Sequence, residues 1–154
     1  LAKQIGKPSS FFEFGSEISD NKIIQSRVFN EAKQEILQII NIYHKPKNNR
    51  DSKSSWEKEI ENATNRGVIF KAIYPIKADL PPALKKLNKN NPKSFQIKRL
   101  DLDYPRCDIV DGNKTMIKLI HEDALSFGGI IFLEDKKFSQ NLKKVFNKFW
   151  DEAK

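Results

Sequence analysis

The chain has 154 residues, of which 38% are apolar and 10% aromatic. This length suits one domain, and the apolar content excludes a chain that is disordered by composition. Lysine and arginine outnumber aspartate and glutamate by 28 to 20, which gives a net charge of +8. A basic surplus favours nucleic acid or phosphorylated ligands. The lysines are scattered along the chain, however, so a solvated surface is the simpler interpretation.

Other simple features narrow the class of protein further. Cys107 is the single cysteine, which excludes an intrachain disulfide, and its apolar neighbours favour a small core residue. No apolar run approaches the roughly 20 residues of a membrane span, and residues 1–10 lack the apolar core of a signal peptide. We therefore expect a cytoplasmic protein with no metal, no cofactor and no membrane partner.

The first part of the chain predicts a strand, a helix and a second strand. Residues 1–10 are polar and are expected to be a linker or lead-in, and the aromatic run Phe11–Phe14 suits an edge strand. Asp20 is a candidate N-cap for an amphipathic helix over Asn21–Lys33. The dense β-branched run Glu35–Tyr43 is typical of a strand buried on both faces, as in a parallel sheet.

A polar stretch follows this strand and begins with His44. In open α/β sheets, ligands bind beyond the carboxyl ends of the strands. Tyr43 and His44 are therefore candidate ligand-binding residues. A solvated surface loop is the alternative.

The middle of the chain predicts a β-α-β unit and a third strand. Ser54 and Glu57 form a capping box that begins a helix, and Gly67 suits its end. The next strand is Val68–Tyr74. A short proline-initiated helix then separates it from a third strand over Phe95–Leu102.

The last third predicts a hairpin, a short strand and a long helix. The Asp111-Gly112-Asn113 turn returns Cys107–Val110 onto Lys114–Ile120. We expect a loop over His121–Gly129 and a strand over Ile130–Leu133. Asp135 should cap a final helix that carries a wide apolar stripe, formed by Phe138, Leu142, Val145, Phe146, Phe149 and Trp150.

This order of elements resembles the phospholipase D-like fold, an α/β fold with a mixed β-sheet flanked by helices on both faces. Within it, the chain is most similar to the C-terminal effector domains of archaeal TrmB-type transcriptional regulators. The resemblance covers nearly the whole chain from Phe11 and is carried by Trp56, Asn65-Arg66-Gly67-Val68, Ile109-Val110-Asp111-Gly112 and Phe149-Trp150.

Active phospholipase D-like enzymes carry the motif H-x-K-x4-D, and the resemblance implies that this chain has a degenerate version of it. Tyr104 stands at the position of the nucleophilic histidine and Arg106 at that of the lysine, while Asp111 is retained. A phenol has a pKa near 10 and replaces an imidazole poorly, whereas a guanidinium still binds an anion. In the alternative interpretation these residues form no binding site. Tyr104 then belongs to a Tyr-Pro turn, Arg106 is a surface charge, and Asp111 belongs to an ordinary Asp-Gly hairpin turn.

The resemblance therefore implies a non-catalytic domain over residues 11–154 that senses a small effector and dimerises in a transcription regulator. The effector would be sugar-like or anionic, and DNA would be bound through an upstream domain. The predicted ligand-binding residues are Tyr43, His44, Tyr104, Arg106 and Asp111.

Two alternatives remain open. The first is an active phosphodiesterase or nuclease of the same superfamily that uses His44 or His121 as its nucleophile. The second is a basic module that binds nucleic acid directly, driven by the net charge of +8.

Overall fold

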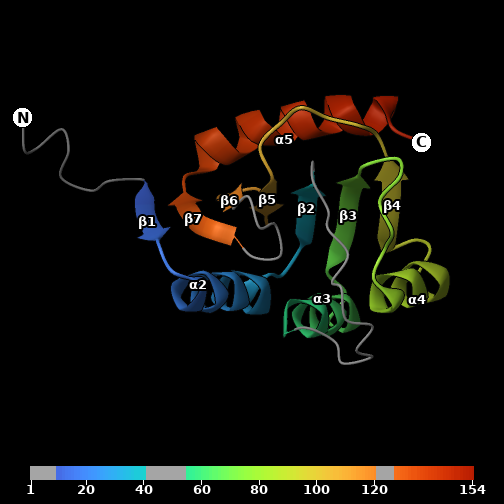
Figure 1. The fold of residues 1–154 in the computed structure, drawn as a ribbon, viewed down its shortest axis with the longest axis horizontal. Coiled ribbons are helices and arrows are strands. Elements are labelled where there is room, and N and C mark those ends of the chain that lie inside the picture. Colours follow the sequence, from blue (N-terminus) through green and yellow to red (C-terminus); the bar gives the residue numbers. More distant parts are fainter. Residues whose placement is uncertain (1–9, 41–54, 121–126) are drawn as a thin grey trace, which may run out of the picture.

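The structure, a computed structural model, describes residues 10–40, 55–120 and 127–154. Its centre is a seven-stranded sheet with the strand order β1-β7-β6-β5-β2-β3-β4 (Figure 1). The strands are β1 (Phe11–Gly15), β2 (Glu35–Ile39), β3 (Ile69–Tyr74), β4 (Phe95–Arg99), β5 (Cys107–Val110), β6 (Lys114–Ile120) and β7 (Phe127–Glu134). The helices are α2 (Ile18–Glu31), α3 (Ser55–Asn65), α4 (Pro82–Asn90) and α5 (Lys136–Glu152).

The sheet is mixed, as predicted. Strands β2, β3 and β4 are parallel, whereas β5, β6, β7 and β1 add to β2 through antiparallel pairs. Helices α2, α3 and α4 cover one face, and α5 crosses the other (Figure 1). The predicted arrangement of a mixed sheet with helices on both faces is therefore confirmed.

Each face of the sheet has its own apolar core, and β2 contributes to both. Ile36 and Ile40 belong to the cluster under α2 and α3, while Leu37 and Ile39 belong to the cluster under α5. Because successive side chains of a strand point to opposite faces, a strand covered on both sides is mostly apolar, and Gln38 is the buried polar exception in β2. This confirms that β2 is a doubly buried strand.

Several predicted turns and caps are also confirmed. Gly67 ends α3 with a positive φ of 90°. Asp111 and Gly112 have φ values of 54° and 69° in the tight turn between β5 and β6. The side chain of Asp135 accepts a hydrogen bond of 2.8 Å from the amide of Phe138 at the start of α5.

Two predictions about local structure were wrong. Helix α2 begins at Ile18 with Glu17 at the N-cap, and Asp20 lies in its first turn. Strand β7 begins at Phe127, so the glycine pair at residues 128 and 129 lies inside a strand and not in a loop. A side chain at Gly129 would sit 3.1 Å from the carbonyl oxygen of Gly15, so glycine lets β1 approach β7 closely.

The apolar stripe of α5 is confirmed except at its first member. Phe146 is buried, but Phe138 is 42% exposed. The inward position beside it belongs to Ser139, whose hydroxyl lies 2.8 Å from that of Thr115 on β6. No helix among the described residues is long and apolar enough to cross a membrane.

Candidate functional site

Tyr104 and Arg106 lie in the connection that leads into β5. Strand β5 runs antiparallel to β2, and Cys107 pairs with Ile39 at the end of β2. Both residues therefore lie near the carboxyl ends of the parallel strands, which is the edge where ligands bind in open α/β sheets. The candidates Tyr43 and His44 lie outside the described residues, as does His121.

Tyr104 is a packing residue of the core under α5. Its ring lies 5.4 Å from that of Phe149, in an edge-to-face arrangement, and it packs against the apolar cluster on that side of the sheet. Burial raises the pKa of its phenol, and the nearby Cys107 raises it further. Both effects disfavour the phenolate, so this tyrosine is a weaker nucleophile than an exposed one.

Arg106 interacts with Lys118 on the α2 side of the sheet, opposite to the α5 side where Tyr104 packs. Its backbone carbonyl accepts a hydrogen bond of 2.9 Å from the amide of Lys118, and its positive charge contributes to lowering the pKa of the Lys118 amine. The Lys118 amine in turn lies 5.7 Å from the ring centre of Phe29 on α2. The structure thus brings Arg106 together with residues under α2, while Tyr104 packs under α5.

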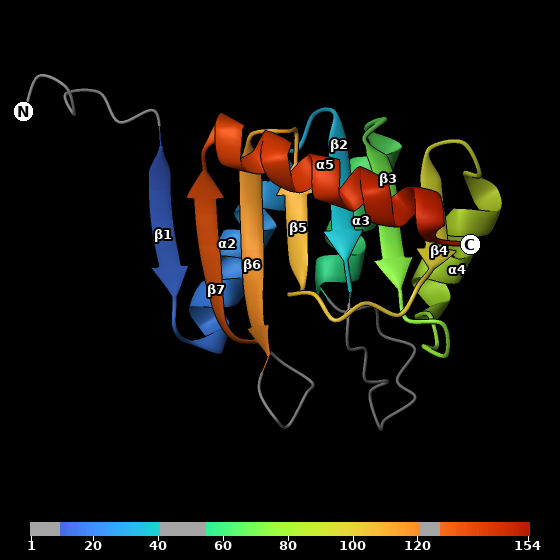
Figure 2. The ribbon, with the colours of Figure 1, turned by 90° about the horizontal axis from the view of Figure 1, so that it is seen from above.

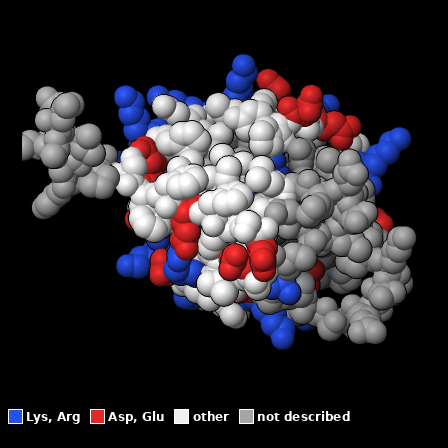
Figure 3. Space-filling view, turned by 60° about the vertical axis from the view of Figure 1, so that its left-hand side comes forward, with Lys and Arg blue, Asp and Glu red and all other residues white. Residues whose placement is uncertain are grey.

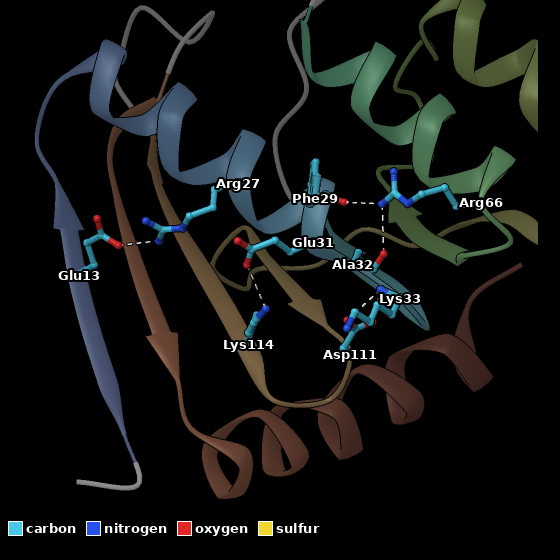
Figure 4. Close-up of polar contacts among 9 residues, drawn as sticks. All are labelled: Glu13, Arg27, Phe29, Glu31, Ala32, Lys33, Arg66, Asp111 and Lys114. Carbon is cyan, nitrogen blue, oxygen red and sulfur yellow. Dashed lines mark hydrogen bonds and ion pairs between the residues drawn. The ribbon is translucent and has the colours of Figure 1, made fainter. Parts of the chain in front are cut away.

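Asp111 lies at the other end of β5 and holds the start of β2. Its carboxylate accepts a hydrogen bond of 2.9 Å from the amide of Lys33 (Figure 4). It also accepts from the amides of Gln34 and Glu35 at 2.7 and 3.1 Å. Its own amide donates to the carbonyl of Glu35 at 3.0 Å. The structure does not bring Asp111 to the same edge as Tyr104 and Arg106, and it gives this side chain a structural role.

A buried ion pair that the sequence analysis did not identify lies next to Arg106. The Lys118 amine on β6 and the Asp108 carboxylate on β5 are 2.7 Å apart, and each side chain is 1% exposed. Burial lowers the pKa of Lys118, Asp108 opposes that shift, and Arg106 reinforces it. Taking two charges out of water costs several kcal/mol per ion. The attraction between the two charges and the packing around them must offset this cost, which a surface ion pair does not have.

Two further polar groups extend this ion pair. Gln38 on β2 is the neighbour of Asp108 across the sheet, and its side-chain carbonyl oxygen is buried without a hydrogen-bond partner among the described residues. Glu59 on α3 bonds Ser26 on α2 and is close enough to feel the charge of Lys118. Burial raises the pKa of Glu59, which Ser26 and Lys118 oppose. We call this set the buried polar cluster: Gln38, Asp108 and Lys118, which are buried, with the half-buried Glu59 and Arg106.

The buried polar cluster combines two cationic side chains, two carboxyl groups and an amide with an unused acceptor. Polar groups of these kinds form strong, directed hydrogen bonds in a buried setting when they find partners. The sequence signal was the presence of Asp108 and Lys118 inside otherwise apolar strands. Among the described residues, no group of histidine, cysteine, aspartate and glutamate could hold a metal ion.

Cys107 is adjacent to this cluster in sequence but faces the other core. Its thiol is 2% exposed, and burial raises its pKa to about 12, with Asp108 adding to the shift. A thiol of this kind stays protonated and is a poor nucleophile. The predicted role of Cys107 as a core residue is confirmed.

No family model matches the sequence, and no curated protein matches it. Solved structures do match. TrmBL2, an archaeal chromatin protein whose structure shows a novel mode of DNA binding, superposes with a TM-score of 0.65 and 18% identity over 99% of this chain. This chain covers 55% of TrmBL2, about half its length.

Two further solved structures match over almost their whole length. NUC, a phospholipase D family member from Salmonella typhimurium, superposes with a TM-score of 0.71 and 13% identity over 94% of this chain and 97% of NUC. NucT from Helicobacter pylori gives 0.65 and 11% identity over 94% of this chain and 98% of NucT. At these identities the likeness concerns the fold, and it confirms that this chain has the phospholipase D-like fold, shared with the TrmB-like protein TrmBL2.

Proposed function

We propose that this chain is a non-catalytic effector-sensing and dimerisation domain of a transcriptional regulator. TrmBL2 supports a regulatory context, since that protein is a DNA-binding chromatin protein and nearly the whole of this chain superposes on it. This chain matches only 55% of TrmBL2. In our proposal the full regulator binds DNA through a separate domain outside this chain.

The observation that carries the proposal is the buried polar cluster near the carboxyl ends of the parallel strands. Its ion pair of 2.7 Å and the unused acceptor of Gln38 supply recognition groups. The groups around Tyr104 that could serve as nucleophiles have raised pKa values. Tyr104 and Cys107 also lie on the other face of the sheet from the cluster, so neither supplies it with a nucleophile, which suits binding without turnover. The effector is a small polar metabolite, sugar-like or anionic.

The test is a thermal-shift screen of sugars, sugar phosphates and dicarboxylates, followed by calorimetry on any compound that responds. A ligand at about 100 times its Kd adds about 2.7 kcal/mol of stability, which raises the Tm of a domain of this size by about 5–10 °C. The variant Gln38→Leu should abolish the shift without loss of stability, because the acceptor that it removes has no partner among the described residues.

Gln96→Leu is the matched control, since Gln96 is half-buried on β4 at the far edge of the sheet. It should leave the thermal shift unchanged. An unaltered shift in Gln38→Leu would contradict the assignment of the effector to this cluster. No response from any compound would contradict the sensing role.

Phosphodiesterase activity is the second candidate, and the match to 97% of NUC favours it. It requires hydrolysis of bis-p-nitrophenyl phosphate that is lost in His44→Ala or His121→Ala. We expect no hydrolysis by the unaltered chain.

Direct DNA binding by this basic domain is tested in the same preparation, by retention on DNA that falls steeply with salt.

A further inference from the structure

The two edges of the sheet are finished in different ways. At β4 the amide of Lys154 donates to the carbonyl of Arg99 at 3.1 Å, so the C-terminal end of the chain caps that edge. At β1 the edge carries Phe11, Phe12 and Phe14, which are 53%, 61% and 52% exposed. Proteins normally protect an open edge with lysine, proline or a covering segment. The described residues place none of these devices on β1.

Phe12 and Phe14 continue into an apolar surface on the α5 side of the sheet, whereas Phe11 packs against Phe132 on the other side. Phe12 pairs with Leu133 and Phe14 with Ile131, both half-buried on β7. Leu119 on β6 is 43% exposed, and both it and Phe14 lie within 3.5 Å of the side-chain position of Gly129. We call this surface the β1 face: Phe12, Phe14, Leu119, Ile131 and Leu133.

Helix α5 leaves the β1 face open. It begins beside β7 and crosses the sheet toward β4, away from β1 (Figure 2). The view that brings the β1 side forward shows a broad area without charged groups, bordered by acidic and basic side chains (Figure 3). An apolar patch with a charged rim is the usual composition of a protein interface.

The size of this surface fits a partner of similar dimensions. A phenylalanine offers roughly 200 Å², so Phe12 and Phe14 together expose roughly 230 Å². A standard interface covers about 800 Å² on each partner. The remaining members of the β1 face and the backbone edge of β1 extend the surface toward that value.

The charges beside the edge identify the partner. Glu13 on β1 and Arg27 on α2 form an ion pair of 2.6 Å, and their side chains are 34% and 38% exposed (Figure 4). A site that presents both signs side by side is complementary to itself across a two-fold axis, since the acid of one copy meets the base of the other. Antiparallel pairing of an edge strand with its own copy has the same symmetry.

We propose that the β1 face, together with the edge of β1, is the surface through which two copies of this chain associate. Strand β1 pairs antiparallel with β1 of the second copy, and Phe12 and Phe14 of the two copies pack against each other. This inference rests on the dimerisation part of the proposed function and does not depend on effector binding.

The experiment measures the mass of the full chain by sedimentation velocity over a range of concentrations, without any ligand. The unaltered chain should be a dimer. Phe12→Lys with Phe14→Lys should raise the dimer dissociation constant at least about tenfold, because charges at the centre of an interface remove its apolar packing. Both side chains are more than half exposed in this chain, so the circular dichroism spectrum of the folded variant should stay unchanged.

Ile76→Lys is the matched control, because Ile76 is 58% exposed but follows β3 on the other half of the sheet. It should remain a dimer. A monomeric unaltered chain would overturn the inference and the dimerisation role together. A dimer that persists in the Phe12, Phe14 double variant would overturn only the assignment of the dimer surface to β1. A monomeric Ile76→Lys variant would overturn the same assignment.

A charge exchange tests the identity of the partner. Glu13→Arg should weaken the dimer, because it places like charges together within each copy and across the axis. Glu13→Arg combined with Arg27→Glu should restore it. If the double exchange stays as weak as the single variant, the proposed pairing of β1 with itself is wrong.

Discussion

At the scale of single residues, the buried ion pair between Asp108 and Lys118 is the most informative feature. Each side chain is 1% exposed, and the Lys118 amine also faces the ring of Phe29. A pair of charges in such a place is costly to keep and still more costly to break, since the remaining charge has no water to compensate it. Replacing a buried pair by apolar residues often costs little stability, so stability alone does not explain the pair.

The single variant Lys118→Met should therefore destabilise the domain by about 3–5 kcal/mol, because it leaves a buried carboxylate without its cation. Lys118→Met with Asp108→Leu should recover most of that loss, since both charges are gone. Urea denaturation near neutral pH measures both values. If the double variant loses as much as Lys118→Met and Asp108→Leu alone lose together, the two side chains are not coupled.

The buried thiol of Cys107 predicts that the free energy of unfolding depends on pH. Its thiol pKa rises from 9.0 to about 12 on folding because it is buried, so the native state keeps a proton that the unfolded state loses. The contribution of this thiol to stability is full below pH 9 and falls by about 1.4 kcal/mol per pH unit between 9 and 12.

Unfolding free energies at pH 8, 9 and 10 should therefore decline more steeply in the unaltered chain than in Cys107→Ala. The variant keeps every other titrating group, so the difference between the two slopes isolates the thiol. Parallel slopes would mean that the thiol is accessible to water in the native state.

At the scale of elements, the connection from α2 to β2 is held from two directions. Arg66 at the end of α3 donates to the carbonyls of Phe29 and Ala32 at 3.0 and 3.1 Å, which satisfies the end of α2 (Figure 4). Asp111 in the β5–β6 turn accepts from the amides at the start of β2. The turn and the connection thus fix each other, which sets the register of β2 against β5.

Asp111→Ala should cost about 2–3 kcal/mol, because it leaves amides without an acceptor and puts alanine in a left-handed conformation at φ 54°. Asp111→Asn should cost less, because asparagine tolerates that conformation and keeps one acceptor oxygen. Chemical denaturation distinguishes the two. A loss as large for asparagine as for alanine would assign the effect to charge and not to backbone geometry.

At the scale of the whole molecule, α5 connects the antiparallel and parallel halves of the sheet. It begins beside β7 and ends near β4, where the Lys98 amine donates to the carbonyl of Trp150 at 3.0 Å. The cluster beneath it joins Leu37 and Ile73 of the parallel half to Ile109 of β5. Both halves should therefore unfold together in one cooperative transition.

Phe146→Ala should lower the free energy of unfolding by about 3–5 kcal/mol, because the ring is 1% exposed at the centre of this cluster. Phe138→Ala, on the same helix but 42% exposed, should cost less than about 1 kcal/mol. Denaturation followed by both fluorescence and circular dichroism should give coincident transitions for both variants. Separate transitions in either one would show that the halves fold independently.

The sequence by itself determined the order of the elements, and its resemblance to a known family implied the phospholipase D-like fold. Hydrophobic periodicity, the Gly67 and Asp135 helix ends and the Asp111-Gly112 turn are local signals, because each depends on residues within one or two turns of chain. They failed where a distant neighbour decided the outcome. Gly129 looked like a loop residue, but it is a strand residue because β1 approaches it closely.

Only the tertiary structure decided which polar residues meet. The motif spacing grouped Tyr104, Arg106 and Asp111, but the fold sends the first under α5, the second toward Lys118 and the third to the opposite end of β5. Asp108 and Lys118 came together through the register of the β5–β6 hairpin, and the helices on that face removed them from water. Register and coverage depend on packing between distant segments, which is why a pattern read along one chain could not reveal the buried polar cluster.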